Sequence, residues 1–223
     1  MARSKAKSRK LVERDTEEAL RRRGAELLGL VLIGIGALAW ILIWSYSPDD
    51  PSLFSATDAA PRNALGLVGA SIADPLHRAL GWAAFGIGVT CAVWGLRLVL
   101  HAGETRVVSR VIAAPVALLA GAAFAATHVP PAGWSHDYGL GGLLGDALLA
   151  QILSLLPFAA KAALPFVSVG LGLGFVLVAG YALGVNWPEL GRFLRHVRLG
   201  SIMVYAGLHR LGGRAAAGAA GGG

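Results

Sequence analysis

The side chains that could carry out chemistry are few and scattered along this sequence. Six histidines occur, and no two of them stand four residues apart, as the HExxH type of zinc site requires. The glycine-rich strings GIGALA (34–39) and GLGLG (170–174) look like phosphate-binding loops, but both lie within uncharged apolar runs instead of following a soluble strand. The Walker A pattern GxxxxGK(S/T) is absent from the sequence. The residue pattern therefore predicts no catalytic, metal-binding or cofactor-binding residue.

Several acidic residues precede the second apolar run of the chain. Asp49 and Asp50 belong to the string SPDDPS (47–52), in which proline fixes φ and aspartate accepts hydrogen bonds from nearby amides, as in turns. A calcium site needs several oxygen ligands at defined spacing, and Asp49, Asp50, Asp58 and Asp74 do not have that spacing. We therefore expect a turn at this point, and not a metal site.

Composition identifies the class of protein. Of the 223 residues, 55% are apolar and 15% are charged, and the mean hydropathy is +0.61. A soluble domain usually carries about 25% charged residues, so this chain has too little polar surface for an ordinary cytosolic enzyme and is too apolar for a disordered chain. The single Cys91 cannot form an intrachain disulfide, which excludes a disulfide scaffold. The class that remains is an integral membrane protein.

Four uncharged apolar runs match the roughly 20 residues that a helix needs to cross about 30 Å of hydrocarbon. These runs are 27–44, 79–96, 111–127 and 162–185. Helices are expected because lipid offers no partners for backbone amides. A further run, 140–158, is interrupted by polar residues and is interpreted as a re-entrant or interfacial helix on the outer side. The predicted fold is all-α: a polytopic membrane helix bundle with four transmembrane helices, this outer helix between spans three and four, and a basic amphipathic C-terminal helix.

Lysines and arginines are distributed unevenly between the segments that flank the spans. Seventeen lie in the N-terminal segment, the second connection and the tail, whereas three lie in the first and third connections. By the positive-inside rule, both termini and the second connection are cytoplasmic. We therefore predict a multi-pass protein of the plasma membrane, with a basic cytoplasmic segment at 1–24 followed by a four-span membrane domain at 25–187.

The tail predicts contact with a membrane surface. Within 188–211, apolar residues recur at i, i+3, i+4 and i+7, and Arg192, Arg195 and Arg198 lie away from the centre of that stripe. This pattern is typical of a helix that lies on anionic headgroups. Stacking aromatic residues are not interleaved with the arginines, so direct DNA binding is not expected. The Ala/Gly-rich run 212–223 is typical of a flexible linker, which we expect to lead into a further part of a longer protein.

Small residues recur every four positions inside the predicted spans. Such faces let helices approach closely where lipid gives no hydrophobic driving force. We interpret them as packing within the bundle, with contacts between subunits or with partners as the alternative. The candidates are Ala113, Ala117, Gly121 and Ala125 in the third span and Gly170, Gly174, Gly180 and Gly184 in the fourth.

Three strings resemble one known family in their order and placement. SYSPDDPS (45–52) follows the first span, NALGLVGASIAD (63–74) leads into the second, and GGLLGD (141–146) precedes the last. Together they resemble the N-terminal membrane domain of the FtsK/SpoIIIE DNA translocases, over most of 25–187. The resemblance implies a bacterial division protein whose membrane part sits at the septum, with a separate hexameric ATPase that pumps double-stranded DNA. No motor sequence is present here, so the resemblance assigns ATP hydrolysis to no residue of this chain.

The resemblance implies a membrane anchor and septal scaffold that links the cell division machinery to chromosome segregation. Its implied partners are the bilayer with its anionic headgroups, other division proteins and further copies of the chain. The residues expected to shape the outer face all lie in the three strings, and a turn or packing role is the alternative for each. They are Ser47, Pro48, Asp49, Asp50, Pro51, Asn63, Gly66, Gly69, Ala70, Asp74, Gly141, Gly142 and Gly145.

Two other classes of function stay open on the sequence alone. A small membrane channel or transporter needs polar groups along a path, for which Thr90 and Ser168 are among the few candidates. A membrane enzyme that acts on lipid needs converging polar groups at one interface. The outer side holds His128, His136, Asp137 and Asp146 for that role.

Overall fold

All the regular secondary structure in the described residues is helical. The computed structural model describes residues 2–102, 107–134, 136–157, 159–185 and 195, and within 2–15 it describes the backbone alone. The elements are α1 (Ala2–Trp44), α2 (Gly66–Leu80), the 3-10 helix η1 (Gly81–Ala84), α3 (Phe85–Val99), α4 (Val107–Ala126), α5 (Gly142–Ser154) and α6 (Ala160–Ala182).

Four helical stretches of the described chain are long and apolar enough to cross a membrane. They are Thr16–Trp44, Gly66–Val99, Val107–Ala126 and Ala160–Ala182. This confirms the predicted all-α bundle with four membrane spans. α5 has 13 residues, which at 1.5 Å per residue is too short to cross about 30 Å of hydrocarbon. Whether α5 is re-entrant or lies on the surface stays a prediction.

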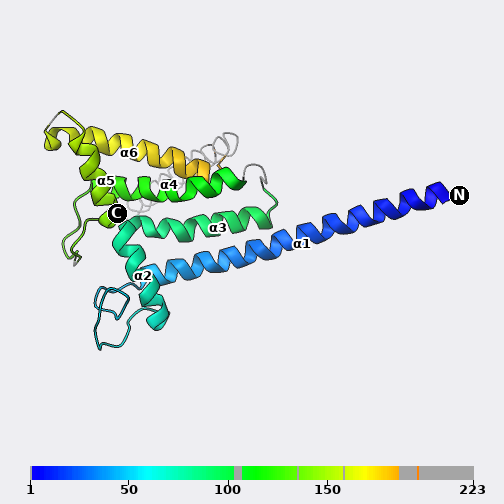
Figure 1. Cartoon of the computed structure of the whole chain (residues 1–223), viewed down its shortest axis with the longest axis horizontal. Coiled ribbons are helices and arrows are strands. Elements are labelled where there is room, and N and C mark those ends of the chain that lie inside the picture. The colour runs from blue at the N-terminus through cyan, green and yellow to red at the C-terminus, as the bar shows by residue number, and fades with distance from the viewer. Residues whose placement is uncertain (1, 103–106, 135, 158, 186–194, 196–223) are drawn as a thin grey trace, which may run out of the picture. The chain divides into compact units, whose positions relative to one another are not determined.

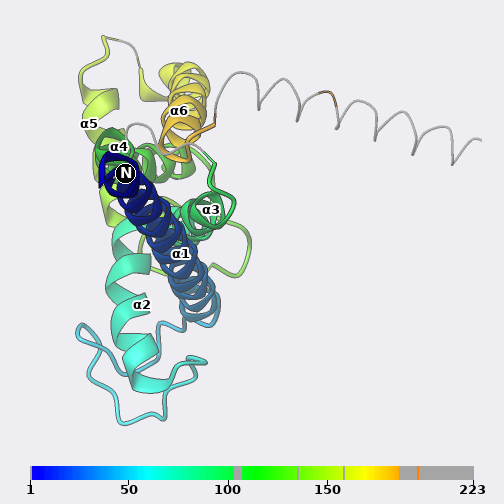
Figure 2. The ribbon, with the colours of Figure 1, turned by 90° about the vertical axis from the view of Figure 1, so that its right-hand side faces the viewer.

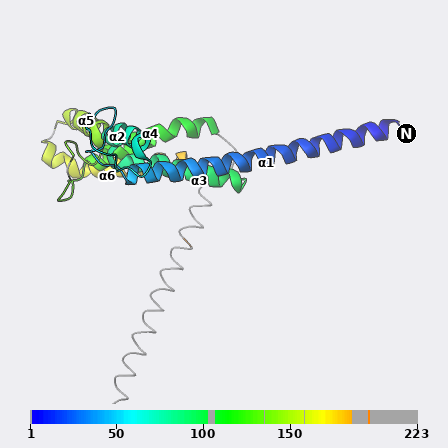
Figure 3. The ribbon, with the colours of Figure 1, turned by 90° about the horizontal axis from the view of Figure 1, so that it is seen from below.

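The long helices form two pairs. α1 packs along α3, and α4 packs along α6, whereas α3 and α4 make few direct contacts. α2, η1 and α5 join the two pairs at one end, together with the segments 45–65 and 127–141; we call this the loop end. α2 crosses the ends of the long helices, as Figure 2 shows in a view roughly along α1 and α3. At the opposite end, α1 continues beyond α3 (Figures 1 and 3).

The helices at the first two predicted spans do not have the same limits as the spans. The first span was predicted at 27–44, and α1 contains it within one helix that runs without interruption from Ala2 to Trp44. The run 79–96 was expected to form one helix, but α2 ends at Leu80, because Gly81 adopts φ +56, a conformation that glycine reaches at little cost. The chain then turns through η1 into α3, so the second predicted span begins with a corner.

The chain divides into two compact units, Met1–Gly184 and Val185–Gly223. In the second unit Arg195 is helical and exposed. Arg192, Arg198 and the rest of the predicted amphipathic helix lie outside the described residues, as does the Ala/Gly-rich run 212–223. The surface role of this tail therefore stays a prediction.

Candidate functional site

The turn predicted at 47–52 is present and has an internal carboxylate. The backbone amide of Asp50 donates to the carbonyl oxygen of Ser47 over 3.2 Å. Pro48 and Pro51 flank the two aspartates and are half-buried. The side chain of Asp49 is 76% exposed, whereas Asp50 as a whole is 3% exposed. The two neighbouring carboxylates thus have different environments, since only the side chain of Asp50 is buried.

Asp50 holds the segment that begins α2. Its two carboxylate oxygens accept hydrogen bonds from the backbone amides of Arg62 and Asn63, each over 2.9 Å. The buried side chain of Asn63 donates from Nδ2 to the carbonyl oxygen of Leu42 over 2.8 Å and accepts from the backbone amide of Leu65 over 3.1 Å. Two buried polar side chains therefore tie the end of α1 to the start of α2, and each finds partners as burial requires.

Small residues let the first turn of α2 close over Asn63. Gly66 adopts φ +63, and its amide donates to the carbonyl oxygen of Asn63 over 2.8 Å. Gly69 packs against the Asn63 side chain, and a Cβ atom there would lie 2.7 Å from the Cβ of Leu65. Ala70 is 1% exposed. Any larger residue at Gly69 would displace the asparagine that joins the two helices.

Asp74 is the centre of a second set of hydrogen bonds at the loop end. It is 2% exposed. One carboxylate oxygen accepts from the hydroxyl of Tyr46 over 2.9 Å and from Nε of Arg78 over 2.7 Å. The other accepts from the hydroxyl of Ser52 over 2.5 Å. The three donors lie in the segment 45–65 and in α2 itself, so Asp74 ties α2 to the segment that follows α1.

Five aromatic and histidine rings pack beside Asp74 and fasten the segment 127–141 to the segment 45–65 and to α2. The ring centroids of Tyr46 and His77 are 4.5 Å apart, and those of His136 and Tyr138 are 5.2 Å apart, both in stacked geometry. His77 Nδ1 and the Tyr138 hydroxyl are hydrogen-bonded over 2.9 Å. Trp134 donates from Nε1 to the carbonyl oxygen of Tyr138 over 2.6 Å. Burial raises the pKa of Tyr46 and of Tyr138, so both phenols keep their protons.

His136 makes the stability of this cluster dependent on pH. Burial lowers the pKa of His136, and the positive charge of Arg78 lowers it further, against the smaller opposing effects of Asp137 and Asp74. A base whose pKa is depressed by folding binds its proton more readily in the unfolded chain. Stability is therefore expected to fall as the pH drops below the ordinary histidine value of 6.5. Thermal unfolding in detergent between pH 7.5 and pH 5 measures this loss.

His136→Gln is expected to reduce that acid sensitivity, because the variant has no imidazole to protonate at this position. His128→Gln is the matched control, since His128 is an exposed histidine of the same segment. An unchanged loss of stability in His136→Gln, or an equal effect of both variants, would contradict the assignment.

Glycines allow α5 to pack against α4 and against the corner at Gly81. Gly141 and Gly145 contact the carbonyl of Ala122 in α4, and a Cβ atom at Gly145 would lie 2.7 Å from its carbonyl carbon. Gly142 adopts φ +66, and its Cβ position is 2.5 Å from the amide nitrogen of Gly81. The string GGLLGD therefore brings backbone against backbone where the two helix pairs join. Gly81 belongs to the same contact, although the sequence analysis did not single it out.

α1 and α3 also pack through glycines of both helices. Gly29 faces Gly95, and Gly36 faces Gly88, so that each glycine Cβ position meets a backbone carbonyl of the other helix. At Gly36 the carbonyl oxygen of Gly88 is 2.7 Å away, and at Gly88 the carbonyl oxygen of Gly36 is 2.9 Å away. The signal in the sequence is a pair of glycines seven residues apart on each helix, which places them on one face two turns apart.

A family model described as the 4TM region of DNA translocase FtsK/SpoIIIE matches residues 21–191. The chain belongs to the FtsK/SpoIIIE family. The match covers three spans completely, the first span from residue 21 onward, and all three strings on which the resemblance was based, and it concerns the membrane region of these translocases.

Relatives of this FtsK/SpoIIIE membrane region carry the name DNA translocase FtsK. The protein of Caulobacter vibrioides is 33% identical over 167 residues, which are 73% of this chain and 20% of that protein. The protein of Bradyrhizobium diazoefficiens is 34% identical over 169 residues, 70% of this chain and 20% of that protein. That of Azospirillum brasilense is 31% identical over 192 residues, 85% of this chain and 29% of that protein. This chain thus spans between a fifth and three-tenths of these relatives. No solved structure matches it.

Part of the small-residue pattern of this FtsK/SpoIIIE region lies between α4 and α6. Gly121 lies under the ring of Phe175, whose Cε2 is 2.9 Å from the glycine's Cβ position. Ala117 is buried, and Ala113 and Ala125 are half-buried. These α4 positions are therefore buried to different degrees. In the contact between α4 and α6, a glycine of each helix packs against a phenylalanine ring of the other. The ring of Phe124 covers Gly172 in the same way, at 2.9 Å.

Of the glycines in α6, Gly172 contacts α4, and it was not among the positions expected to pack. At the Cβ positions of Gly170, Gly174 and Gly180, no atom of another described helix lies within 4 Å. Gly172 is the residue of α6 that faces α4, and a packing role for the other three stays a prediction. Their contact between copies of the chain stays a prediction. Gly184 does pack, with φ +77, against the guanidinium of Arg110.

The polar groups considered for other functions have local partners. Thr90 donates from its hydroxyl to the carbonyl oxygen of Gly86 in its own helix over 2.7 Å. The hydroxyls of Ser168 and Thr127 are hydrogen-bonded over 2.8 Å. Asp146 accepts from the amide of Gly139 over 2.8 Å and so closes the loop before α5. Neither a transport path nor a catalytic set gains support from these contacts.

Proposed function

We propose that this chain anchors an FtsK-type DNA translocase in the bacterial plasma membrane at the division septum. There it acts as a scaffold that links the division machinery to chromosome segregation. The observation that carries the proposal is the match to the 4TM region of DNA translocases over 21–191. Translocation of DNA is the activity in the names of the relatives, of which this chain spans a minor part, and no residue here is assigned to ATP hydrolysis.

The proposed orientation places both termini in the cytoplasm and the loop end outside. It is supported by the basic residues, which are concentrated in the N-terminal segment, the connection between α3 and α4, and the tail. In this orientation the hydrogen-bonded segments 45–65 and 127–141 face the other division proteins. The side chains of the three strings that form these hydrogen bonds hold the outer segments in place.

Two exposed apolar residues that are available to a division protein lie next to the turn at 47–52. Leu53 is 77% exposed and Phe54 is 67% exposed. They follow Ser52, whose hydroxyl accepts from the amides of Phe54 and Ser55 while it donates to Asp74. Two large apolar side chains are thus held at the surface by a segment fixed to the bundle. Exposed apolar groups rimmed by polar ones are typical of interaction sites.

A fluorescent protein that matures only in the cytoplasm, fused after Gly223, tests anchor, orientation and scaffold together. We expect a membrane signal enriched at the septum. Leu53→Ser with Phe54→Ser should keep the membrane signal and lose most of the enrichment, whereas Asp58→Asn, an exposed change in the same segment, should keep both. A fusion without fluorescence would contradict the orientation, and a uniform signal around the cell would contradict septal targeting by this region.

A further inference from the structure

α2 has an apolar face that the protein covers in one half only. The residues of this face recur at spacings of three and four, which places them on one side of the helix. They are Leu65, Val68, Ile72, Leu76 and Leu80. Leu76 and Leu80 pack against the buried cluster at the end of α1 that contains Leu42 and Ile43, whereas Leu65, Val68 and Ile72 are exposed. The face therefore rests on the bundle in the second half of α2 and continues past the end of α1 in the first (Figures 1 and 2).

The opposite side of α2 is polar and is bound to the segments of the loop end. Asp74 is buried by its hydrogen bonds to the segment 45–65, and His77 is hydrogen-bonded to the segment 127–141. At 3.6 residues per turn, Asp74 lies about 160° around the helix axis from Ile72. α2 is thus amphipathic, with one side that holds polar segments and another that is apolar.

Aromatic residues place the corner between α2 and α3 at the surface of the membrane. Trp82, which follows Gly81, and Trp44, the last residue of α1, are both exposed. The ring of Trp44 packs edge-on against that of Phe85, the first residue of α3, with their centroids 6.3 Å apart. The end of α1 and the start of α3 therefore lie at one depth. Indole rings that face outward at the ends of spans are typical of the boundary between lipid headgroups and acyl chains.

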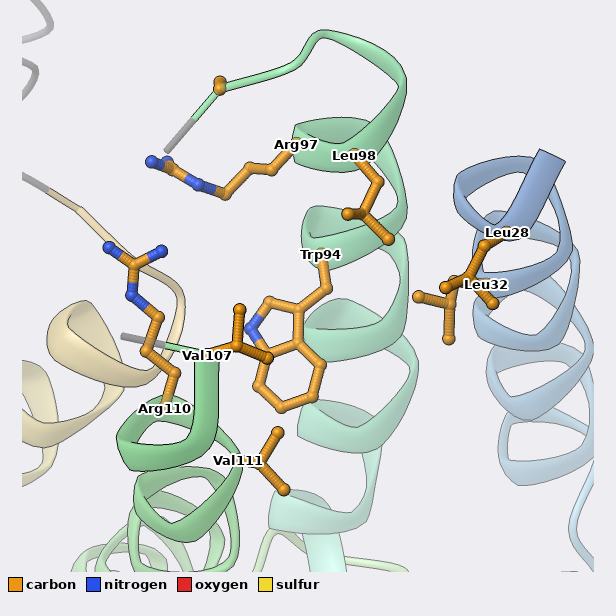
Figure 4. A pocket seen from close by; sticks show the side chains of 9 residues that line it. Leu28, Leu32, Trp94, Arg97, Leu98, Val107, Arg110 and Val111 are labelled. Carbon is orange, nitrogen blue, oxygen red and sulfur yellow. The ribbon is translucent and has the colours of Figure 1, made fainter. Parts of the chain in front are cut away.

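The tryptophan at the opposite end of α3 packs inside the bundle instead. Figure 4 shows the indole of Trp94 beside Val111 of α4, where it lines a cavity between α1, α3 and α4. Its Nε1 donates to the carbonyl oxygen of Ala182 in α6 over 2.8 Å. The outward position of Trp44 and Trp82 is thus a particular feature of the loop end.

α3 can cross the membrane without α2. η1 has 4 residues and α3 has 15, which at about 2.0 and 1.5 Å per residue extend over about 30 Å, the thickness of the hydrocarbon. The apolar stretch Gly66–Val99 has 34 residues, and its excess length is α2. Because the chain turns at Gly81, α2 crosses the ends of the long helices and does not extend the span (Figure 2).

We propose that α2 is an interfacial helix whose first half binds the lipid leaflet at the loop end. Leu65, Val68 and Ile72 insert at the boundary between headgroups and acyl chains, where amphipathic helices bury their apolar side. The polar side of α2 and the segments that it holds stay in water. The partner is lipid and not a protein, because the exposed half of the face continues the half that packs on membrane helices, at the depth marked by the exposed tryptophans.

Spin labels on the 223-residue chain in liposomes test this insertion. Cys91→Ser removes the one native thiol, and Val68→Cys or Leu67→Cys adds a labelling site to that background. Val68 and Leu67 are 69% and 56% exposed, and Leu67 is seven residues before Asp74, which places it on the polar side. Collisions with oxygen, which concentrates in lipid, are compared with collisions with a water-soluble nickel complex on both sides of the membrane. We expect the ratio of oxygen to nickel collisions to be several times higher at Val68 than at Leu67.

Equal ratios at the two positions would overturn the proposal. Two low ratios would place α2 in water, where its apolar face is open to a protein, and two high ratios would place it within a span. Ile72→Cys against Ser71→Cys repeats the comparison one turn further along α2, so a misfolded variant in one pair leaves the other pair decisive. The outcome is independent of septal targeting and of orientation, because the loop end meets a leaflet on whichever side it faces.

Discussion

Gly36→Leu is expected to separate α1 from α3 and to cost about 3 kcal/mol of folding free energy. A Cβ atom at Gly36 would lie 2.7 Å from the carbonyl oxygen of Gly88 and 2.9 Å from the amide nitrogen of Ala92. Both are backbone atoms, so no rotamer change can relieve the collision, and one helix must move away. Thermal unfolding of the purified chain in detergent, followed by circular dichroism and size exclusion, measures the effect.

Gly34→Leu is the matched control for this variant. It makes the same change on the same helix two residues away, at a position with no atom of the described chain within 4 Å. Its stability is expected to stay within about 0.5 kcal/mol of the wild type, as for an exposed substitution. If both leucine variants unfold at the same temperature as the wild type, the glycine contact between α1 and α3 does not exist in solution.

Asp74→Ala is expected to destabilise the loop end by about 3 kcal/mol. The substitution removes the acceptor of three donors, the hydroxyls of Tyr46 and Ser52 and the guanidinium of Arg78. Partly buried donors without an acceptor are costly, and the arginine also loses its counter-charge. The segment 45–65 should then become accessible to protease while the spans stay folded, which limited proteolysis and thermal unfolding can measure together.

Asp58→Ala separates this effect from the general effect of losing a carboxylate. Asp58 belongs to the same segment and is exposed. We expect its rate of cleavage and its unfolding temperature to match those of the wild type. Rapid cleavage of both variants would mean that the segment is held by something other than Asp74.

The spans could be predicted from the sequence because membrane insertion depends on local composition. A run such as 111–127 has no charge along its length, and α4 covers Val107–Ala126. The corner at Gly81 could not be predicted in the same way, because its residues are as apolar as the helices on either side. It depends on contact with Gly142 and on the hydrogen bond from the Trp82 amide to Leu140, which join positions 61 and 58 residues apart.

Helix faces were predicted less well than helix positions. Gly170 and Gly174 have the same spacing as a packing motif, and the sequence does not show which face of α6 meets α4. That choice depends on Phe124 and Phe175, whose rings cover Gly172 and Gly121. Among the outer strings, Asp49 and Asp50 are indistinguishable as neighbours, and the role of Asp50 is apparent only once the amides of Arg62 and Asn63 lie beside it.

The joining of both helix pairs at one end has a mechanical consequence. The buried hydrogen bonds of Asp50 and Asp74 and the backbone contact between Gly81 and Gly142 lie there, while at the other end a cavity lies between α3 and α4. The bundle is therefore held together more firmly at one membrane face than at the other. Lateral compression of the bilayer should bring the two helix pairs closer together at the less firmly held end. Tension on the connection between α3 and α4 should move them apart there, while the ring cluster of the loop end keeps its contacts.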